Sequence, residues 1–209
     1  MWRLLQLADS AFPTGGFAHS AGLEAAAQAG LVPDVRAFAR EAIWQAGLGA
    51  LPLIRAAHCS PPELPALDAR AEAFLVNHVA NRASRTQGRA FSSTCARIFP
   101  ERFQRPPPGL CLHLAPLWGA VFAALGVPLL DAQRLHLWTC ARSVLSAAVR
   151  LGLVGTLESQ SLLASLDPVL DEALQQCGPL ALDALSQPAP LLDLLQGTHD
   201  RLYSRLFQS

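Results

Sequence analysis

The chain of 209 residues contains no lysine, and all sixteen of its basic residues are arginine. This absence excludes mechanisms that need a lysine amine, such as a Walker A phosphate site, a Schiff base or a lysine general base. Acidic residues also number sixteen, so the net charge is zero and no overall field attracts nucleic acid or an anionic membrane. Arginine still offers a planar fork to carboxylates and carbonyls, so we expect charge recognition at protein interfaces.

Charged residues of either sign are scarce, at 15% of the chain against about 25% in an average globular protein. Hydrophobic residues make up 51%, which leaves little polar material to cover the outside. The length suits one domain covering residues 1–209, because a core of this size is well buried. We therefore expect some apolar surface to meet a partner protein.

β-Branched residues are also few, and no segment alternates between apolar and polar residues as a half-buried strand would. Apolar residues recur instead at helical spacing, as in the series Leu135, Trp138, Ala141, Leu145 and Ala148. The prediction is an all-α, single-domain helical bundle of about ten helices. The helices are expected near residues 3–9, 19–29, 34–47, 50–57, 62–85, 88–99, 114–126, 131–150, 157–165, 168–176 and 191–206.

The capping-box spacing of Ser60 and Glu63 predicts a helix start there, and Asp167-Pro168 predicts another start, with an end near Gly178. The uncharged run from Leu110 to Leu130 has the length of a membrane span, about 20 residues. Proline and glycine interrupt that run, and its neighbours are amphipathic, so we favour a central core helix and no membrane partner.

The five cysteines are far apart and include no CxxC pair, which indicates free thiols in a reducing compartment. The apolar run at the start of the chain is too short to be the core of a signal peptide, so the expected location is cytoplasmic. The six histidines show no HxxxH, HxH or Cys/His grouping at ligand spacing, so no metal site and no cofactor are predicted. A symmetric pair of His19 or His199 across a dimer would be an exception.

Asp9, Ser10 and His19 lie close together in the sequence, which admits a hydrolase hypothesis based on Ser10 and His19. Ser10 lacks the GxSxG elbow that would project a nucleophile, so this alternative is weak. Gly15-Gly16 could present amides to an anion, but the pattern favours a tight turn whose flanking Phe12 and Phe17 anchor it in the core.

Arg82, Arg85 and Arg89 share one helical face, which is either a solvated stripe or a docking site for an acidic partner. Gly88 within this stretch weakens the prediction of a continuous helix. Residues 198–209 combine the only tyrosine with two arginines and large apolar side chains, which is a composition typical of interface hot spots. This tail either docks a partner or packs as a last helix on its own domain.

Three separated segments resemble one family, that of the urease accessory protein UreF. LLQLADSAFPTGGFAHSAGLEAA at residues 4–26 is similar to its N-terminal signature. HLAPLWGAVFAALGVPL at 113–129 and LSAAVRLGLVG at 145–155 are similar to its central helices, and YSRLFQS at 203–209 to its ending. The resemblance implies a non-catalytic, all-α protein that forms a homodimer, binds UreD (also called UreH) and recruits the GTPase UreG to apo-urease for nickel insertion. A nickel-binding metallochaperone remains a further alternative.

The resemblance also assigns residues. It places partner docking on Tyr203, Ser204, Arg205, Leu206 and Phe207, with His199 beside them and Arg205 as the arginine expected to recruit the GTPase. It assigns to the N-terminal signature the shaping of a shared or dimer surface, by Phe12, Pro13, Gly15, Gly16, His19, Ser20, Gly22 and Glu24. Gly155-Thr156 and Ser159-Gln160 differ from the family pattern, so the resemblance gives no role to residues 155–160.

Overall fold

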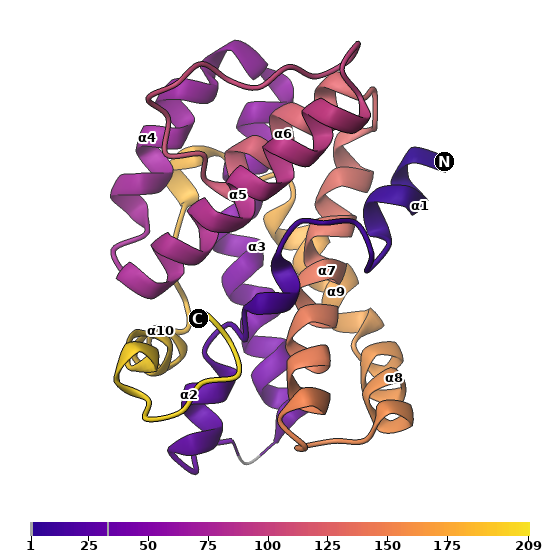
Figure 1. The fold of residues 1–209 in the computed structure, drawn as a ribbon. Helices are drawn as coiled ribbons and strands as arrows, with labels where there is room; N and C mark the ends of the chain where they lie inside the picture. The colour runs from indigo at the N-terminus through magenta and orange to yellow at the C-terminus, as the bar shows by residue number, and fades with distance from the viewer. Residues whose placement is uncertain (1, 33) are drawn as a thin grey trace.

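The computed structural model describes residues 2–32 and 34–209, and it contains ten α-helices and no strand within those ranges (Figure 1). The predicted all-α fold is confirmed. The helices are α1 (Trp2–Ala8), α2 (Leu23–Gln28), α3 (Val35–Cys59), α4 (Leu64–Phe74), α5 (His78–Ile98), α6 (Leu114–Ala124), α7 (Leu129–Arg150), α8 (Thr156–Ser165), α9 (Asp167–Cys177) and α10 (Pro190–Gly197).

Helix α3 forms the centre of the bundle and packs against α4, α6, α7 and α9. The sequence predicted two helices here, 34–47 and 50–57, and this prediction is wrong because α3 continues through Pro52. Proline has no amide to donate to the carbonyl four residues earlier, which leaves the Leu48 oxygen without its helical donor. The Ser186 amide donates to that oxygen over 3.4 Å, so a loop supplies the missing hydrogen bond.

The boundary between α4 and α5 also differs from the predicted 62–85 and 88–99. Helix α4 begins at Leu64, and the Ser60 side chain makes no capping hydrogen bond. Asn77 caps α5 by accepting from the Val79 and Ala80 amides, at 3.0 and 3.4 Å. Gly88 does not end the helix. A Cβ at this position would lie 1.9 Å from the Leu112 oxygen, so the glycine permits a close crossing of the chain.

The apolar run 110–130 contains the short helix α6 and the first residues of α7, and the buried face of α6 contributes to an aromatic stack. Trp118 lies 5.1 Å from the ring centre of Phe91 and 4.8 Å from that of Phe122. Among the described residues, no helix combines the length and apolar character needed to cross a membrane. The predicted helix from Asp167 is confirmed as α9, which ends next to Gly178.

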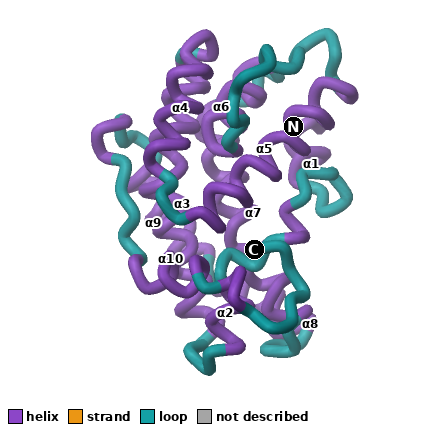
Figure 2. Tube along the Cα trace, turned by 60° about the vertical axis from the view of Figure 1, so that its left-hand side comes forward, coloured by secondary structure: helices purple, strands orange, loops and turns teal. Residues whose placement is uncertain are grey.

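The N-terminal and C-terminal signature segments are less helical than predicted. The expected helix 19–29 begins only at Leu23, and the expected helix 191–206 ends at Gly197. A 3-10 turn, His199–Arg201, follows, and the chain then continues without helix to Ser209. In both views this last segment lies beside α2 and α10 (Figures 1 and 2). The tail is therefore a loop folded back onto the bundle, here called the tail loop (residues 198–209).

Candidate docking surface

Glu24, on α2, is the main attachment point of the tail loop. Its side chain is only 1% exposed, and its carboxylate accepts the Leu206 amide at 2.6 Å and the Phe207 amide at 3.2 Å. The carboxylate also contacts Nε2 of His199 at 3.0 Å, and the His199 side chain is fully buried. A buried carboxylate is stable only when hydrogen bonds replace its water shell. The tail loop supplies all three of these bonds.

Ser20 and His19 hold the far end of the tail loop. The Ser20 amide and hydroxyl both donate to the main-chain oxygen of Ser209, over 2.6 and 3.0 Å. Nδ1 of His19 lies 2.5 Å from the Ser209 hydroxyl. Burial, followed by the charges of Arg82 and His199, lowers the pKa of His19 to about 4. At neutral pH His19 is therefore uncharged and makes a neutral hydrogen bond inside the protein.

Arg150, at the end of α7, joins the signature segment to the tail loop from outside. Its guanidinium lies 4.0 Å from the ring centre of Phe17 and 4.1 Å from that of Phe207. It also donates to the main-chain oxygens of Phe17 and Leu206, at 2.7 and 3.4 Å. The prediction that Phe17 anchors its loop in the core is wrong, because the side chain is 72% exposed and lies under Arg150. Phe12 is buried, as predicted.

Asp200 connects the tail loop to the predicted basic stripe on α5. Arg82 binds the Asp200 carboxylate with both nitrogens, at 2.7 and 3.0 Å, and His78 lies 3.2 Å away. The hydrogen bonds from Arg82 lower the pKa of Asp200 to about 2. Arg205 approaches the same carboxylate at 3.5 Å. Within the described residues, the acidic partner of Arg82 thus belongs to the chain itself.

Between these attachments the tail loop presents a short solvent-facing stretch. Tyr203 is fully exposed, and Ser204 and Arg205 are exposed beside it. Leu206 is 61% exposed although its amide is bound to Glu24. These exposed side chains, an aromatic, an arginine and a leucine, lie on a backbone that is fixed by hydrogen bonds. They form a preorganised contact surface, because the backbone loses little conformational entropy on binding.

The other signature residues shape the backbone around this surface. Gly22 has a φ of 87°, and a Cβ there would come within 3.0 Å of Cβ of Gln196 on α10. Pro13 accepts a hydrogen bond from Thr94 through its carbonyl oxygen, at 3.1 Å. Gly15 precedes a three-residue 3-10 turn that begins at Gly16. The Gly16 amide donates to Thr14 at 3.5 Å, so it is used within the loop and does not form an anion site.

Ser10 and His19 do not form a catalytic pair. Ser10 is exposed, His19 is buried, and the one hydrogen bond of the His19 ring among the described residues goes to Ser209. Both residues line a partly open pocket of about 490 Å³ between the helices. Burial lowers the pKa of His136, which lines the same pocket, to about 4. The geometry does not provide the base-to-nucleophile contact that a hydrolase needs.

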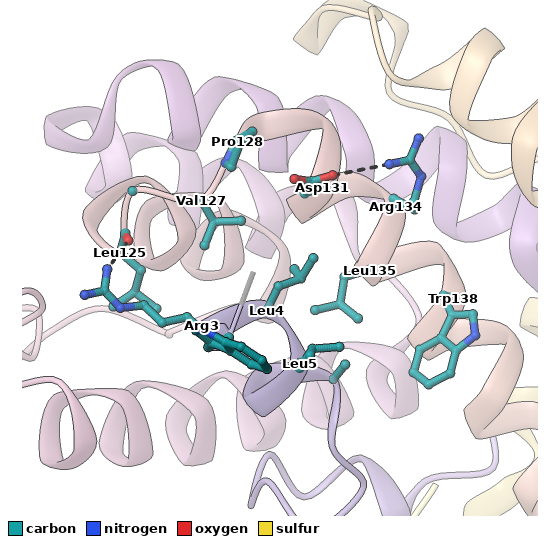
Figure 3. Close-up of a pocket in the computed structure, with 13 residues that line it drawn as sticks. Arg3, Leu4, Leu5, Leu125, Val127, Pro128, Asp131, Arg134, Leu135 and Trp138 are labelled. Carbon is teal, nitrogen blue, oxygen red and sulfur yellow. Dashed lines mark hydrogen bonds and ion pairs between the residues drawn. The ribbon is translucent and has the colours of Figure 1, made fainter.

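A second hollow of about 910 Å³ lies between α1 and the start of α7, and its lining is mostly apolar (Figure 3). Leu4 and Leu5 of α1 point toward Leu135 of α7. Arg3 fixes α1 in place by donating to the Leu125 oxygen at 2.8 Å. Trp2 on the rim is 83% exposed. This groove is a second apolar surface, separate from the tail loop.

Reasoning from spacing missed one group of possible metal ligands. Cys111 and His113 are separated by a single residue, and in the structure their ligand atoms lie within 4.8 Å of each other and of Glu72. The Cys-x-His spacing was the available signal, whereas Glu72 is distant in sequence and could be found only from the fold. Residues 155–160, to which the resemblance gave no role, form the start of α8.

Comparisons with known proteins show the family to which the chain belongs. The UreF family model matches residues 32–167. The chain is 36% identical to urease accessory protein F of Arabidopsis thaliana, over all of this chain and 92% of the relative. It is 34% identical to urease accessory protein F of Oryza sativa subsp. indica, with 99% and 84% covered. It is 32% identical to the urease accessory protein UreF of Mesorhizobium japonicum, with 99% and 95% covered. These alignments extend beyond the matched model to the signature segment and the tail loop, and the chain belongs to the UreF family of urease accessory proteins.

Proposed function

We propose that this chain is a non-catalytic scaffold for urease maturation. In this role it forms a homodimer, binds UreD (UreH) and recruits the GTPase UreG to apo-urease, into which nickel is then inserted. Membership of the UreF family supports a role in urease maturation. The cytoplasm, where free thiols persist, is the proposed location.

The observation that carries the proposal is the construction of the tail loop. Buried attachments at Glu24, Ser20 and His19 hold its backbone, while Tyr203 and Leu206 face solvent. Exposed apolar side chains that gather on one part of a surface are typical of interaction sites. A loop held in this way loses little conformational freedom on binding.

The attachment geometry divides the proposed docking residues into two groups. His199 and Phe207 are buried, so we assign them the positioning of the loop. Tyr203, Ser204, Arg205 and Leu206 are exposed, so we assign them direct contact with UreD or UreG. Arg205 is only weakly held, since its partner Asp200 is already bound by Arg82. Its guanidinium can therefore turn to a carboxylate or carbonyl of the partner.

Self-association is supported by exposed apolar side chains elsewhere on the bundle. Trp2 on α1, Leu157 on α8 and Leu191 on α10 are each more than two thirds exposed. Trp2 and Leu157 belong to helices other than α2 and α10, beside which the tail loop lies, so they are available to a second copy.

Reconstituted urease activation tests the proposal. Apo-urease, UreD, UreG, GTP, bicarbonate and Ni²⁺ are incubated with and without the chain, and urease activity is measured. We expect activation to depend on the chain and to be lost in the double variant Tyr203→Ala/Leu206→Ser. Ser10→Ala serves as the control and should activate normally. Activation that needs no added chain, or that Ser10→Ala abolishes, would contradict the scaffold role.

A deletion of the whole tail loop is less suitable for this test. The deletion would leave the Glu24 carboxylate without its hydrogen-bond donors and expose the surface on which the Phe207 ring packs. A loss of partner binding could then result from a disturbed fold. The side chains of Tyr203 and Leu206 take no part in the attachments of the tail loop, so both can be replaced without removing one. Loss of activation in their variants can therefore be assigned to the contact surface.

A further inference from the structure

Three side chains with metal-binding atoms meet between α4 and the segment that precedes α6. Glu72 belongs to α4, and Cys111 and His113 belong to the segment that leads into α6. Their ligand atoms all lie within 4.8 Å of one another, and Nε2 of His113 is 2.7 Å from Oε2 of Glu72. His113 is fully buried and Glu72 is half exposed, so the cluster is closed on the protein side and open to solvent on the other.

The backbone that carries Cys111 and His113 is held by a buried carboxylate. Asp68, one turn before Glu72 on α4, accepts the main-chain amides of Cys111, Leu112 and His113 at 2.7, 3.2 and 2.7 Å. Leu112 between them has a φ of 63°, a left-handed conformation that is unfavourable for a residue with a side chain. The three hydrogen bonds from one acceptor stabilise this turn, which directs the thiol and the imidazole toward Glu72.

Helix α5 fixes the imidazole from the other side. Nδ1 of His113 lies 3.1 Å from the Ser84 hydroxyl, which also accepts the Leu114 amide at 3.2 Å. Without a metal ion, Nε2 donates to the Glu72 carboxylate and Nδ1 accepts from the Ser84 hydroxyl. A metal ion bound to Nε2 would require the other tautomer, in which Nδ1 donates to Ser84. Histidine ligands in metal sites commonly have such an outer partner for the second ring nitrogen. The close crossing at Gly88 holds this part of α5 against the segment.

A hydrogen bond between His113 and Glu72 alone explains only two members of the cluster. It gives no reason for a thiol at the third corner. A divalent ion would use all three side chains at once, and its binding to the thiolate would release the thiol proton to solvent.

We propose that Glu72, Cys111 and His113 bind one divalent transition-metal ion of the zinc or nickel type. Mixed sulfur, nitrogen and oxygen ligands favour these ions over Mg²⁺ or Ca²⁺, which prefer oxygen alone. Tetrahedral ligand bonds of about 2.0–2.3 Å place ligand atoms about 3.3–3.8 Å apart. Binding therefore requires the 2.7 Å contact between His113 and Glu72 to widen by roughly 0.6 Å, and ligand atoms as far apart as 4.8 Å to approach by roughly 1 Å. The half-exposed Glu72 side chain can make these movements by leaving Asn81, which donates to it at 3.1 Å. Three protein ligands leave a fourth position open to water. The inference does not depend on a role in urease maturation.

Cobalt titration of the metal-free full chain tests the site, because a Co²⁺–thiolate bond gives a charge-transfer absorption. We expect one Co²⁺ per chain to produce this band, and Zn²⁺ or Ni²⁺ added alone to displace it. Cys111→Ser should abolish the band. Cys59→Ser, at an exposed thiol outside the cluster, is the matched control and should keep it. A wild-type chain without the band, or a Cys111→Ser chain that retains it, would overturn the proposal.

A second variant keeps the test decisive if Cys111→Ser fails to fold. Glu72→Gln changes a half-exposed side chain and removes one ligand charge. We expect it to weaken Zn²⁺ binding by about tenfold or more, measured by competition with a chromophoric chelator. An unchanged Zn²⁺ affinity in Glu72→Gln would show that the ion binds elsewhere. Neither readout involves urease, so failure here would leave the scaffold role untouched.

Discussion

Replacing Glu24 by glutamine tests how the tail loop is attached. The substitution keeps the size of the side chain but exchanges one carboxylate oxygen for an NH₂ group. In the protein, one oxygen accepts from Leu206, and the other accepts from Phe207 and contacts His199. Whichever way the glutamine amide turns, its NH₂ group faces at least one main-chain amide. Glu24→Gln therefore leaves a buried donor without an acceptor.

An unsatisfied buried donor costs about 1–3 kcal/mol. The tail loop can relieve this cost by opening locally, at the expense of uncovering Phe207, whose burial is worth about 1.5–3 kcal/mol. The two magnitudes are similar, so we expect both partial opening and a lower free energy of unfolding. Opening that becomes easier by about 1–3 kcal/mol lowers amide protection by roughly 5- to 150-fold.

Hydrogen exchange at the Leu206 and Phe207 amides, followed by NMR, measures the opening, and urea unfolding measures the stability. Glu101→Gln is the control, since Glu101 is exposed in the turn after α5. Protection should fall at both amides in Glu24→Gln and stay at the wild-type level in Glu101→Gln. Wild-type protection together with a wild-type urea midpoint in Glu24→Gln would refute the assignment of Glu24 as the attachment point.

Three further predictions concern the same region and the core. Because burial lowers the pKa of His19 to about 4 from 6.5, the unfolded chain binds the proton first, and stability is lost as the pH falls from 6.5 toward 4. His136 has the same shift, so His19→Asn should remove about half of this slope in urea unfolding, and an unchanged slope would contradict the assignment. Gly22→Ala, at a φ of 87° and against Gln196, should destabilise the fold by about 1–3 kcal/mol, seen as a lower thermal midpoint. Phe122→Ala should cost about 3–5 kcal/mol by urea unfolding, and a loss below 1 kcal/mol would show that the aromatic stack is not part of the core.

The helical class could be predicted from the sequence because apolar spacing is a local property of each segment. Helix limits depend instead on contacts that are distant in sequence. Pro52 is tolerated within α3 because the Ser186 amide donates to the Leu48 oxygen, which the proline leaves without a donor. Gly88 lies within α5 because a neighbouring segment crosses there. Neither partner can be identified from the residues around the proline or the glycine.

The candidate surface was predictable in part. The N-terminal and C-terminal signature segments were found in the sequence, but nothing in their composition indicated that Glu24 and Ser20 would bind the tail loop. The composition left open whether residues 198–209 dock a partner or pack on their own domain. The described structure shows the packing of Phe207 together with the exposure of Tyr203, and only the fold determines which side chain faces which way.

The affinity of purified UreD for the full chain, measured by calorimetry, tests most directly whether the exposed face of the tail loop is a docking surface. Tyr203→Ala/Leu206→Ser is compared with wild type and with Arg201→Ala, a change at an exposed arginine just before the contact stretch. The account predicts that the double variant binds at least about thirtyfold more weakly, the loss of about 2 kcal/mol typical of a hot spot, with an unchanged urea midpoint. Wild-type affinity in the double variant would contradict it.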